Sequence, residues 1–167
     1  FNRFVQGDLV GNAWTEVGSV KIGDVLTRVT RNAQGQLEVN GSKYYSTGSI
    51  FADWIDLYAY DDVNQRPVIA AVNRHDQGVS VLDDWDGFGQ KTTGSGTLTL
   101  KNVTVDEAHV IPFEDRFKYQ TAYYQQFHLA TLTGIAQSAV ESFSHEVCER
   151  KRIFRHGNSD LARHDAQ

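Results

Sequence analysis

The sequence predicts an α+β fragment in which an antiparallel β-barrel or sandwich is followed by a long helix of a C-terminal helical bundle. Up to Pro112, short segments alternate apolar and polar residues, and Gly, Asp, Asn or Pro occupy the connections, as in all-β folds. After Pro112, glycine and proline almost disappear, and apolar residues recur at steps of three and four, the period of one helical face. We therefore place a β-domain at residues 1–112 and the start of a helical-bundle domain at residues 113–167.

Residues 20–29 alternate apolar and polar side chains, and a turn at residues 32–36 leads into residues 37–39. The Asn40-Gly41 pair predicts a hairpin turn, because both residue types tolerate the positive φ that two-residue turns need. Further strands are predicted over residues 43–46, 54–60, 68–73, 79–82 and 96–103.

A long helix is predicted over residues 119–151. Its apolar face is formed by Leu132, Ile135, Ala136, Ala139, Phe143 and Val147. At 1.5 Å per residue, roughly 30 residues give a helix of about 45 Å, which is too long for a domain of about 110 residues to cover. We therefore expect further helices or other subunits to bury this face.

Composition narrows the function classes. The 167 residues carry 16 Lys and Arg against 21 Asp and Glu, and this net charge of -5 disfavours nucleic acid as a partner. No apolar run approaches the roughly 18 residues of a membrane span, so no membrane partner is expected. The single cysteine, Cys148, cannot form an internal disulfide, which predicts a cytoplasmic protein. Because there is no methionine, even at position 1, we expect a piece of a longer protein.

Motifs of several enzyme classes are incomplete. His145-Glu146 lacks the second histidine that a zinc metalloprotease carries four residues after the first, and no metal site is expected. The sequence also lacks the Gly-x-Ser-x-Gly elbow of serine hydrolases and the glycine-rich fingerprints of nucleotide-binding folds.

Four segments carry more polar and aromatic residues than folding requires: residues 11–16, 40–48, 83–96 and 150–155. The first three offer Trp, Tyr, hydroxyl and backbone groups to a planar aromatic ligand, and the fourth offers four cations to a phosphate. A flavin nucleotide has both parts. Taken singly, each segment is equally consistent with a turn or a solvated helix end.

The order of these segments resembles the middle β-domain and first C-terminal helix of the acyl-CoA dehydrogenase superfamily. Within it, the sequence is most similar to the flavin-dependent monooxygenase branch represented by dibenzothiophene monooxygenase. The resemblance is carried by Gly11-Asn12-Ala13 with Glu16, by Asn40-Gly41-x-Lys43 leading to Ser46-Thr47-Gly48, and by Asp83-Asp84-Trp85 with Thr93-x-Ser95-Gly96. The Thr-Glu-Pro-Gly-Ala-Gly-Ser-Asp stretch of the dehydrogenases is not reproduced after Thr15-Glu16, which favours the monooxygenases.

The resemblance implies a monooxygenase that uses reduced FMN and O₂, through a C4a-hydroperoxyflavin, to oxygenate a small sulfur-, nitrogen- or aromatic-containing substrate. A separate flavin reductase would deliver the reduced FMN as a transient partner, and the active protein would be a homotetramer. Two alternatives stay open. One is an acyl-CoA dehydrogenase with FAD as cofactor and a catalytic Glu beyond Gln167, and the other is a non-catalytic ligand-binding β-domain.

The resemblance also implies residue roles. Asn12 and Thr47 would be catalytic, with the Thr47 hydroxyl near flavin N5 and Asn12 hydrogen-bonded to the flavin or its bound oxygen. Trp85 would form a wall of the substrate pocket. Arg152 would reach the flavin phosphate of a neighbouring subunit, although the dehydrogenases carry Arg-x-x-Phe where this chain has Lys151 before Phe154. The full set of expected cofactor contacts is Asn12, Ala13, Trp14, Thr15, Tyr45, Ser46, Thr47 and Arg152.

Overall fold

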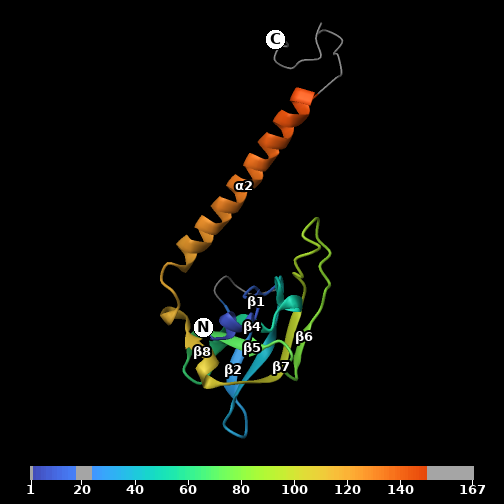
Figure 1. The fold of residues 1–167 in the computed structure, drawn as a ribbon. Helices are drawn as coiled ribbons and strands as arrows, with labels where there is room; N and C mark the ends of the chain where they lie inside the picture. The colour runs from blue at the N-terminus through green and yellow to red at the C-terminus, as the bar shows by residue number, and fades with distance from the viewer. Residues whose placement is uncertain (1, 18–23, 150–167) are drawn as a thin grey trace. The chain divides into compact units, whose positions relative to one another are not determined.

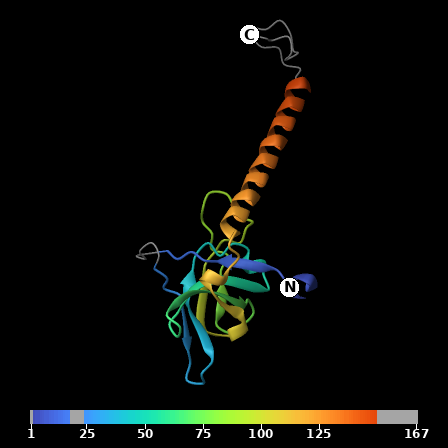
Figure 2. The same cartoon turned by 90° about the vertical axis from the view of Figure 1, so that its left-hand side faces the viewer.

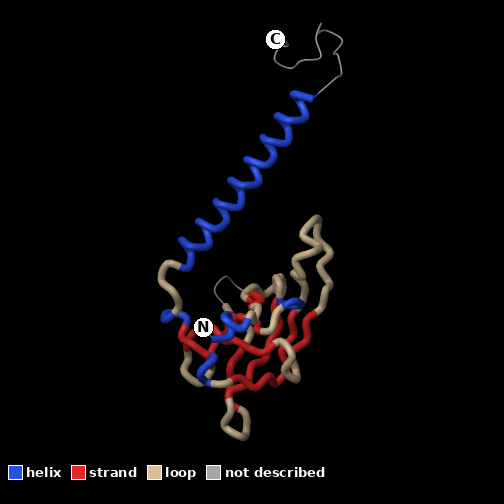
Figure 3. Tube along the Cα trace, in the orientation of Figure 1, coloured by secondary structure: helices blue, strands red, loops and turns tan. Residues whose placement is uncertain are grey.

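The computed structural model describes residues 2–17 and 24–149 (Figure 1). The chain divides into two compact units, with the boundary between Arg116 and Phe117. None of the helices in the described ranges combines the length and the apolarity that crossing a membrane requires. The first unit is built around β-strands joined by loops and short helices, and a single long helix dominates the second (Figure 3).

An eight-stranded mixed sheet forms the first unit. Its strands are β1 (Val10–Ala13), β2 (Arg28–Arg31), β3 (Leu37–Lys43), β4 (Trp54–Asp61), β5 (Arg66–Asn73), β6 (Val79–Val81), β7 (Leu98–Val105) and β8 (Val110–Pro112). The order across the sheet is β6-β7-β3-β2-β4-β5-β8, and β1 pairs with β4. Short helices α1 (Asn2–Gln6), η1 (Ser49–Phe51), η2 (Glu107–His109) and η3 (Phe113–Asp115) complete the unit.

The hydrophobic core follows from the two-residue period of the strands. In β4 and β5, buried residues alternate with half-buried ones, so one face of each strand points into the core. The core consists of Ala13, Val29, Leu37, Val39, Ile55, Leu57, Ala59, Val68, Ala70, Val72, Leu98, Leu100, Val103 and Val105. Most of these residues are β-branched or small, as expected for a closely packed sheet interior.

Strand direction corrects the prediction of a purely antiparallel sheet. Both β1 and β2 pair with β4 in parallel, whereas the other pairings are antiparallel. Strands β6 and β8 end the strand order and do not pair with each other among the described residues. The sheet is therefore not a closed barrel but is sandwich-like. Alternation marks where strands lie, but the neighbours and direction of a strand depend on how the connections run.

The hairpin turn predicted at Asn40-Gly41 is wrong. The pair lies inside β3, where the register against β7 shifts between Val39 and Gly41. A Cβ on Gly41 would lie 2.5 Å from Thr27 Oγ1, so the glycine lets Thr27 pack against the β3 backbone. The turn between β2 and β3 is at residues 32–36, as predicted, and Asn32 Oδ1 accepts hydrogen bonds there from two backbone N–H groups.

Two other predicted strands are shorter or missing. In the segment 20–29, β2 begins only at Arg28, and residues 20–23 lie outside the described residues. The strand predicted over 43–46 is wrong, because β3 ends at Lys43 and Tyr45 takes a positive φ of 59° in the turn that follows. The strands predicted at 54–60, 68–73, 79–82 and 96–103 are present as β4, β5, β6 and β7.

Two connections project from opposite ends of the sheet. The β2–β3 hairpin extends from one end, and the loop over residues 82–97 between β6 and β7 extends from the other, in both views (Figures 1 and 2). The end with the longer loop also carries η1. It therefore gathers irregular segments that are far apart in the sequence.

The second unit contains α2 (Gln120–Glu149), a helix of 30 residues. Its bounds agree with the predicted helix over 119–151, of which residues 150 and 151 lie outside the described residues. The predicted apolar face is exposed, with Leu132, Ile135 and Phe143 at 63%, 62% and 68%. That further helices or subunits cover this face stays a prediction.

Candidate functional site

Three of the four segments singled out from the sequence meet at one end of the first unit. The backbone N–H of Asn12 donates to the Thr47 carbonyl at 3.1 Å, and that of Gly48 donates to the Thr93 carbonyl at 2.9 Å. We call residues 10–16, 44–51 and 82–96 the loop cluster. The structure thus joins strand β1, the turn after β3 and the β6–β7 loop into one surface.

The turn after β3 is fastened to the β6–β7 loop through Ser46. This side chain is fully buried, and its Oγ donates to the Gly96 carbonyl at 2.7 Å, while its backbone N–H donates to the same oxygen at 3.0 Å. A Cβ on Gly96 would lie 2.7 Å from Asp84 Oδ1 and in collision with the Leu82 carbonyl, so glycine permits this close approach. Ser46, predicted as a cofactor contact, therefore holds the two loops together and has no exposed side-chain atom to offer.

Three hydroxyl groups lie next to one another in the loop cluster. Ser95 Oγ is 2.8 Å from Thr47 Oγ1 and 2.7 Å from Thr93 Oγ1, and Thr93 Oγ1 donates to the Gln90 carbonyl at 2.8 Å. We call Thr47, Ser95 and Thr93 the hydroxyl chain. Its outer member, Thr47, is exposed, whereas Ser95 and Thr93 are half-buried.

The Asn12 side chain is another exposed polar group of this surface. Within the described parts of the chain, its amide makes no hydrogen bond, so its donors and acceptor are free for a ligand. The backbone contact from Asn12 to Thr47 keeps the two predicted catalytic residues adjacent.

An aromatic pair borders the same surface. The rings of Tyr45 and Trp85 meet edge to face, with centroids 5.6 Å apart, and the Trp85 indole N–H donates to the Gly89 carbonyl at 2.8 Å. Because that N–H is already bonded, Trp85 offers a ligand its ring rather than a hydrogen-bond donor.

A buried ion pair between Lys43 and Glu16 anchors the chain segment that follows β1. Lys43 is fully buried, and its Nζ donates to Glu16 Oε1 at 2.6 Å and to the Trp14 carbonyl at 3.3 Å. Glu16 also accepts from the Thr27 hydroxyl and from the backbone N–H groups of Leu26 and Thr27. Burial raises the pKa of Glu16, but these hydrogen bonds outweigh it and lower the pKa from 4.5 to about 2.

This pKa predicts a specific acid sensitivity. The folded protein binds the Glu16 proton more weakly than the unfolded chain, so the stability that Glu16 contributes is complete above pH 4.5 and is lost as the pH falls toward 2. The shift corresponds to about 3 kcal/mol. Urea unfolding at pH 7 and pH 3 should show that Glu16→Gln loses less stability on acidification than the wild type. Equal losses in the two proteins would contradict the assignment.

Two predicted cofactor contacts, Ala13 and Trp14, belong to the loop cluster but have side chains that pack against other parts of the first unit. Ala13 is fully buried in the hydrophobic core. The Trp14 indole donates to Asp56 Oδ2 at 2.8 Å, and its ring packs against Tyr58 and Phe113. Burial raises the pKa of Asp56, while the indole hydrogen bond lowers it. The side chains of Ala13 and Trp14 are therefore occupied by packing contacts.

The two remaining predicted cofactor contacts are Thr15, which the structure describes, and Arg152, which it does not. The Thr15 side chain is exposed, and its carbonyl accepts from the Tyr44 N–H at 3.0 Å, which places it beside the turn after β3. Arg152 lies outside the described residues.

Sequence reasoning assigned no role to Ser95 and Thr93. The signal was present, because the Thr93-x-Ser95-Gly96 element carries part of the resemblance. The sequence alone could not assign these two residues a role, because the Thr47–Ser95 contact joins residues 48 positions apart.

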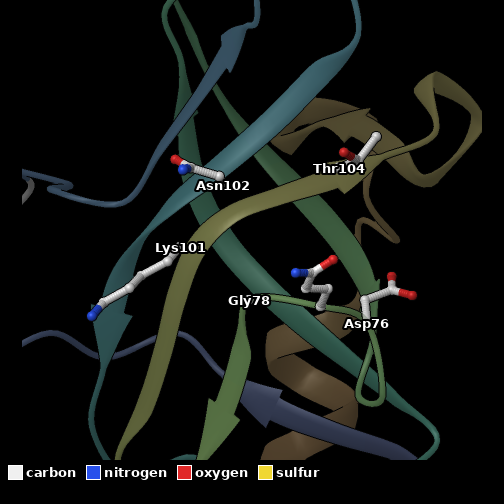
Figure 4. Close-up of a pocket in the computed structure, with 6 residues that line it drawn as sticks. Asp76, Gly78, Lys101, Asn102 and Thr104 are labelled. Carbon is white, nitrogen blue, oxygen red and sulfur yellow. The ribbon is translucent and has the colours of Figure 1, made fainter.

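A cavity of about 560 Å³ lies outside the loop cluster, lined by Asp76, Gln77, Gly78, Lys101, Asn102 and Thr104 (Figure 4). The side chains of Lys101 and Asp76 extend away from each other in this view. The polar groups that line this cavity do not converge on one point, whereas a ligand site requires convergent polar groups.

The loop cluster fits a flavin ring better than a flavin phosphate. Its side chains include an amide, an exposed hydroxyl and two aromatic rings in contact, which suit a planar ring edged with hydrogen-bonding atoms. Lys91 is the only cation in residues 10–16, 44–51 and 82–96, and three aspartates share that surface. A phosphate would therefore need cations from outside the loop cluster.

Comparison with known proteins gives a family match over much of the first unit. The model of the acyl-CoA dehydrogenase middle domain matches residues 12–103. The chain is 29% identical over 119 residues to the probable FMNH2-dependent monooxygenase SfnC of Pseudomonas putida, covering 68% of this chain and 30% of that protein. It is 31% identical over 111 residues to a dibenzothiophene monooxygenase of Rhodococcus erythropolis, covering 64% and 26%.

A solved structure agrees with these relatives. The crystal structure of FMN-bound TdsC from Paenibacillus sp. A11-2 is 29% identical, covers 68% of this chain and 30% of its own, and superposes with a TM-score of 0.60. The chain thus spans less than a third of the length of each of these relatives.

Proposed function

Because this chain belongs to the acyl-CoA dehydrogenase family through its middle domain, we propose that it forms the flavin-facing part of a monooxygenase. The enzyme would use reduced FMN and O₂ to oxygenate a small sulfur-, nitrogen- or aromatic-containing substrate. The resemblance to this family, stated above from the sequence motifs, is confirmed by the family match and by relatives that are named as monooxygenases. The observation that carries the proposal is that Asn12, Thr47 and the Tyr45–Trp85 pair meet on one exposed surface.

Bound reduced FMN would supply two electrons to O₂, so that one oxygen atom enters the substrate and the other leaves as water with two protons. The protein has to hold the flavin ring, exclude water and keep acids away from the reacting oxygen. Asn12 and Thr47 suit this task, because an amide and an alcohol form hydrogen bonds and neither titrates near pH 7.

Trp85 and Tyr45 support the substrate part of the proposal. With the Trp85 N–H bonded to Gly89, the Trp85 ring offers a substrate aromatic carbon, which favours an apolar or aromatic substrate. Trp85 would form one wall of the substrate pocket, and other segments of the protein would complete it.

The remaining parts of the flavin site would come from outside the loop cluster. We assign the flavin phosphate to Arg152 of a neighbouring subunit in a homotetramer, in keeping with the lack of a cationic site within the loop cluster. A flavin reductase would be a transient partner that delivers the reduced FMN, in keeping with the relative that is named an FMNH2-dependent monooxygenase.

The test uses the protein at its natural length. Titration with FMN, in the oxidised form and anaerobically in the reduced form, should show binding. Anaerobic mixing of the FAD-loaded protein with acyl-CoA thioesters should leave the flavin oxidised. Flavin reduction by an acyl-CoA would show a dehydrogenase instead, and absence of any flavin binding would favour a non-catalytic ligand-binding β-domain.

A further inference from the structure

The hydroxyl chain has a direction that its proton count determines. Each hydroxyl carries one proton. The Thr93 proton goes to the Gln90 carbonyl, so in the contact of 2.7 Å between Thr93 and Ser95 it is Ser95 that donates. The Ser95 proton is then used, so in the contact of 2.8 Å between Thr47 and Ser95 it is Thr47 that donates.

The outer end of the hydroxyl chain is therefore a hydrogen-bond acceptor. Among the described residues, the only other partner of the Thr47 hydroxyl is the Tyr45 carbonyl at 3.3 Å, which also takes its proton inward. Thr47 is exposed, so the lone pairs of its Oγ1 are what a ligand meets. Reversing the direction of the hydrogen bonds in the hydroxyl chain would require Thr93 to give up its hydrogen bond to Gln90. This loss disfavours the reversed state by about two- to tenfold.

We propose that the hydroxyl chain Thr47–Ser95–Thr93 makes the flavin site select reduced over oxidised flavin by presenting Thr47 Oγ1 as a hydrogen-bond acceptor. This inference rests on the proposed function, which puts Thr47 beside flavin N5. In reduced flavin, N5 carries a hydrogen that it donates. In oxidised flavin, N5 carries a lone pair, which would face the lone pairs of Thr47 until the chain reversed.

Such selection suits a protein that receives its flavin reduced. The incoming reduced flavin would be bound with its N5–H satisfied, and the oxidised flavin left after turnover would be released. Ser95 and Thr93 are positioning residues in this scheme, because they act through Thr47 and do not touch the flavin.

The test compares affinities for the two redox states of FMN in the natural-length protein. Thr93→Val keeps the shape of the side chain but removes the acceptor for Ser95, which frees Ser95 to donate to Thr47 and Thr47 to donate outward. The ratio of the Kd for oxidised FMN to the Kd for reduced FMN should fall by about two- to tenfold. A tenfold fall equals a decrease of about 30 mV in the midpoint potential of bound FMN. Ser95→Ala should lower the ratio in the same direction.

Two controls separate this role from a structural one. Thr93→Ser keeps the chain and should keep the wild-type ratio, and so should Thr92→Val, which removes an exposed neighbouring hydroxyl outside the chain. Thermal melting verifies that each variant is folded. If Thr93→Val and Ser95→Ala bind FMN with the wild-type ratio, or weaken both redox states equally, the inference is wrong and the proposed function stands. If the wild type binds neither form of FMN, the proposed function is wrong, and the inference falls with it.

Discussion

Replacing Asn12 with alanine should shorten the interval between O₂ consumption and formation of oxidised flavin by roughly tenfold to a hundredfold. A bound flavin would cover Asn12, and loss of one buried hydrogen bond costs about 1–3 kcal/mol, which sets this range. Reduced flavin and O₂ would then give oxidised flavin and H₂O₂ in place of oxygenated product. Stopped-flow absorbance, with peroxide quantified in parallel, measures both effects.

The structure makes this variant informative. The Asn12 amide has no partner among the described residues, and its backbone N–H, which bonds Thr47, is retained in alanine, so the fold should persist. Thr47→Ala should act in the same direction. Asn2→Ala, on the exposed helix α1, is the matched control and should behave as the wild type. If Asn12→Ala and Thr47→Ala both keep the wild-type interval and peroxide yield, these residues only shape the loop cluster.

The second large effect concerns stability. Lys43→Met should lower the free energy of unfolding by about 3–5 kcal/mol, because it leaves the Glu16 carboxylate buried without its cation. The Lys43 and Glu16 side chains are only 0% and 7% exposed, so solvent cannot replace the lost partner. Urea denaturation at neutral pH measures the change.

A matched exposed pair provides the control. Arg31 and Glu107 form an ion pair of 2.7 Å with side chains that are 42% and 69% exposed, so Arg31→Met should cost about 1 kcal/mol or less. Replacing Glu16 and Lys43 together with leucine and methionine should recover much of the loss, since no unpaired charge remains. Equal effects of Lys43→Met and Arg31→Met would contradict the importance of burial.

Local patterns predicted much of the fold. The alternation in 54–60 and 68–73 and the three- and four-residue steps of α2 each report on the element that contains them, and these elements are present. The hairpin turn predicted at Asn40-Gly41 is absent, because the same two residues that suit a turn also suit a close approach to Thr27 within a strand. That approach, like the parallel pairing of β1 with β4, depends on segments far away in the chain.

The candidate site was predictable as a set of segments but not as a set of contacts. The motifs that carry the resemblance brought attention to Asn12, Thr47 and Trp85, and the structure places these residues on one surface. The same reasoning placed Ala13 and Trp14 with them, although their side chains pack against the core and Asp56. The Ala13 side chain points inward because successive residues of β1 face opposite sides of the sheet, whereas Trp14 lies beyond the end of β1 and is directed by its hydrogen bond to Asp56.

A stopped-flow experiment on the wild type tests most directly whether the protein is an FMN-dependent monooxygenase. The natural-length protein, loaded anaerobically with reduced FMN, is mixed with O₂, and O₂ consumption and oxidised flavin are followed separately. If the loop cluster holds reduced flavin and its bound oxygen, oxidised flavin forms only after a resolved interval, and Asn12→Ala shortens this interval. Oxidised flavin that forms in step with O₂ consumption, at the rate of free reduced FMN, would contradict this role of the loop cluster.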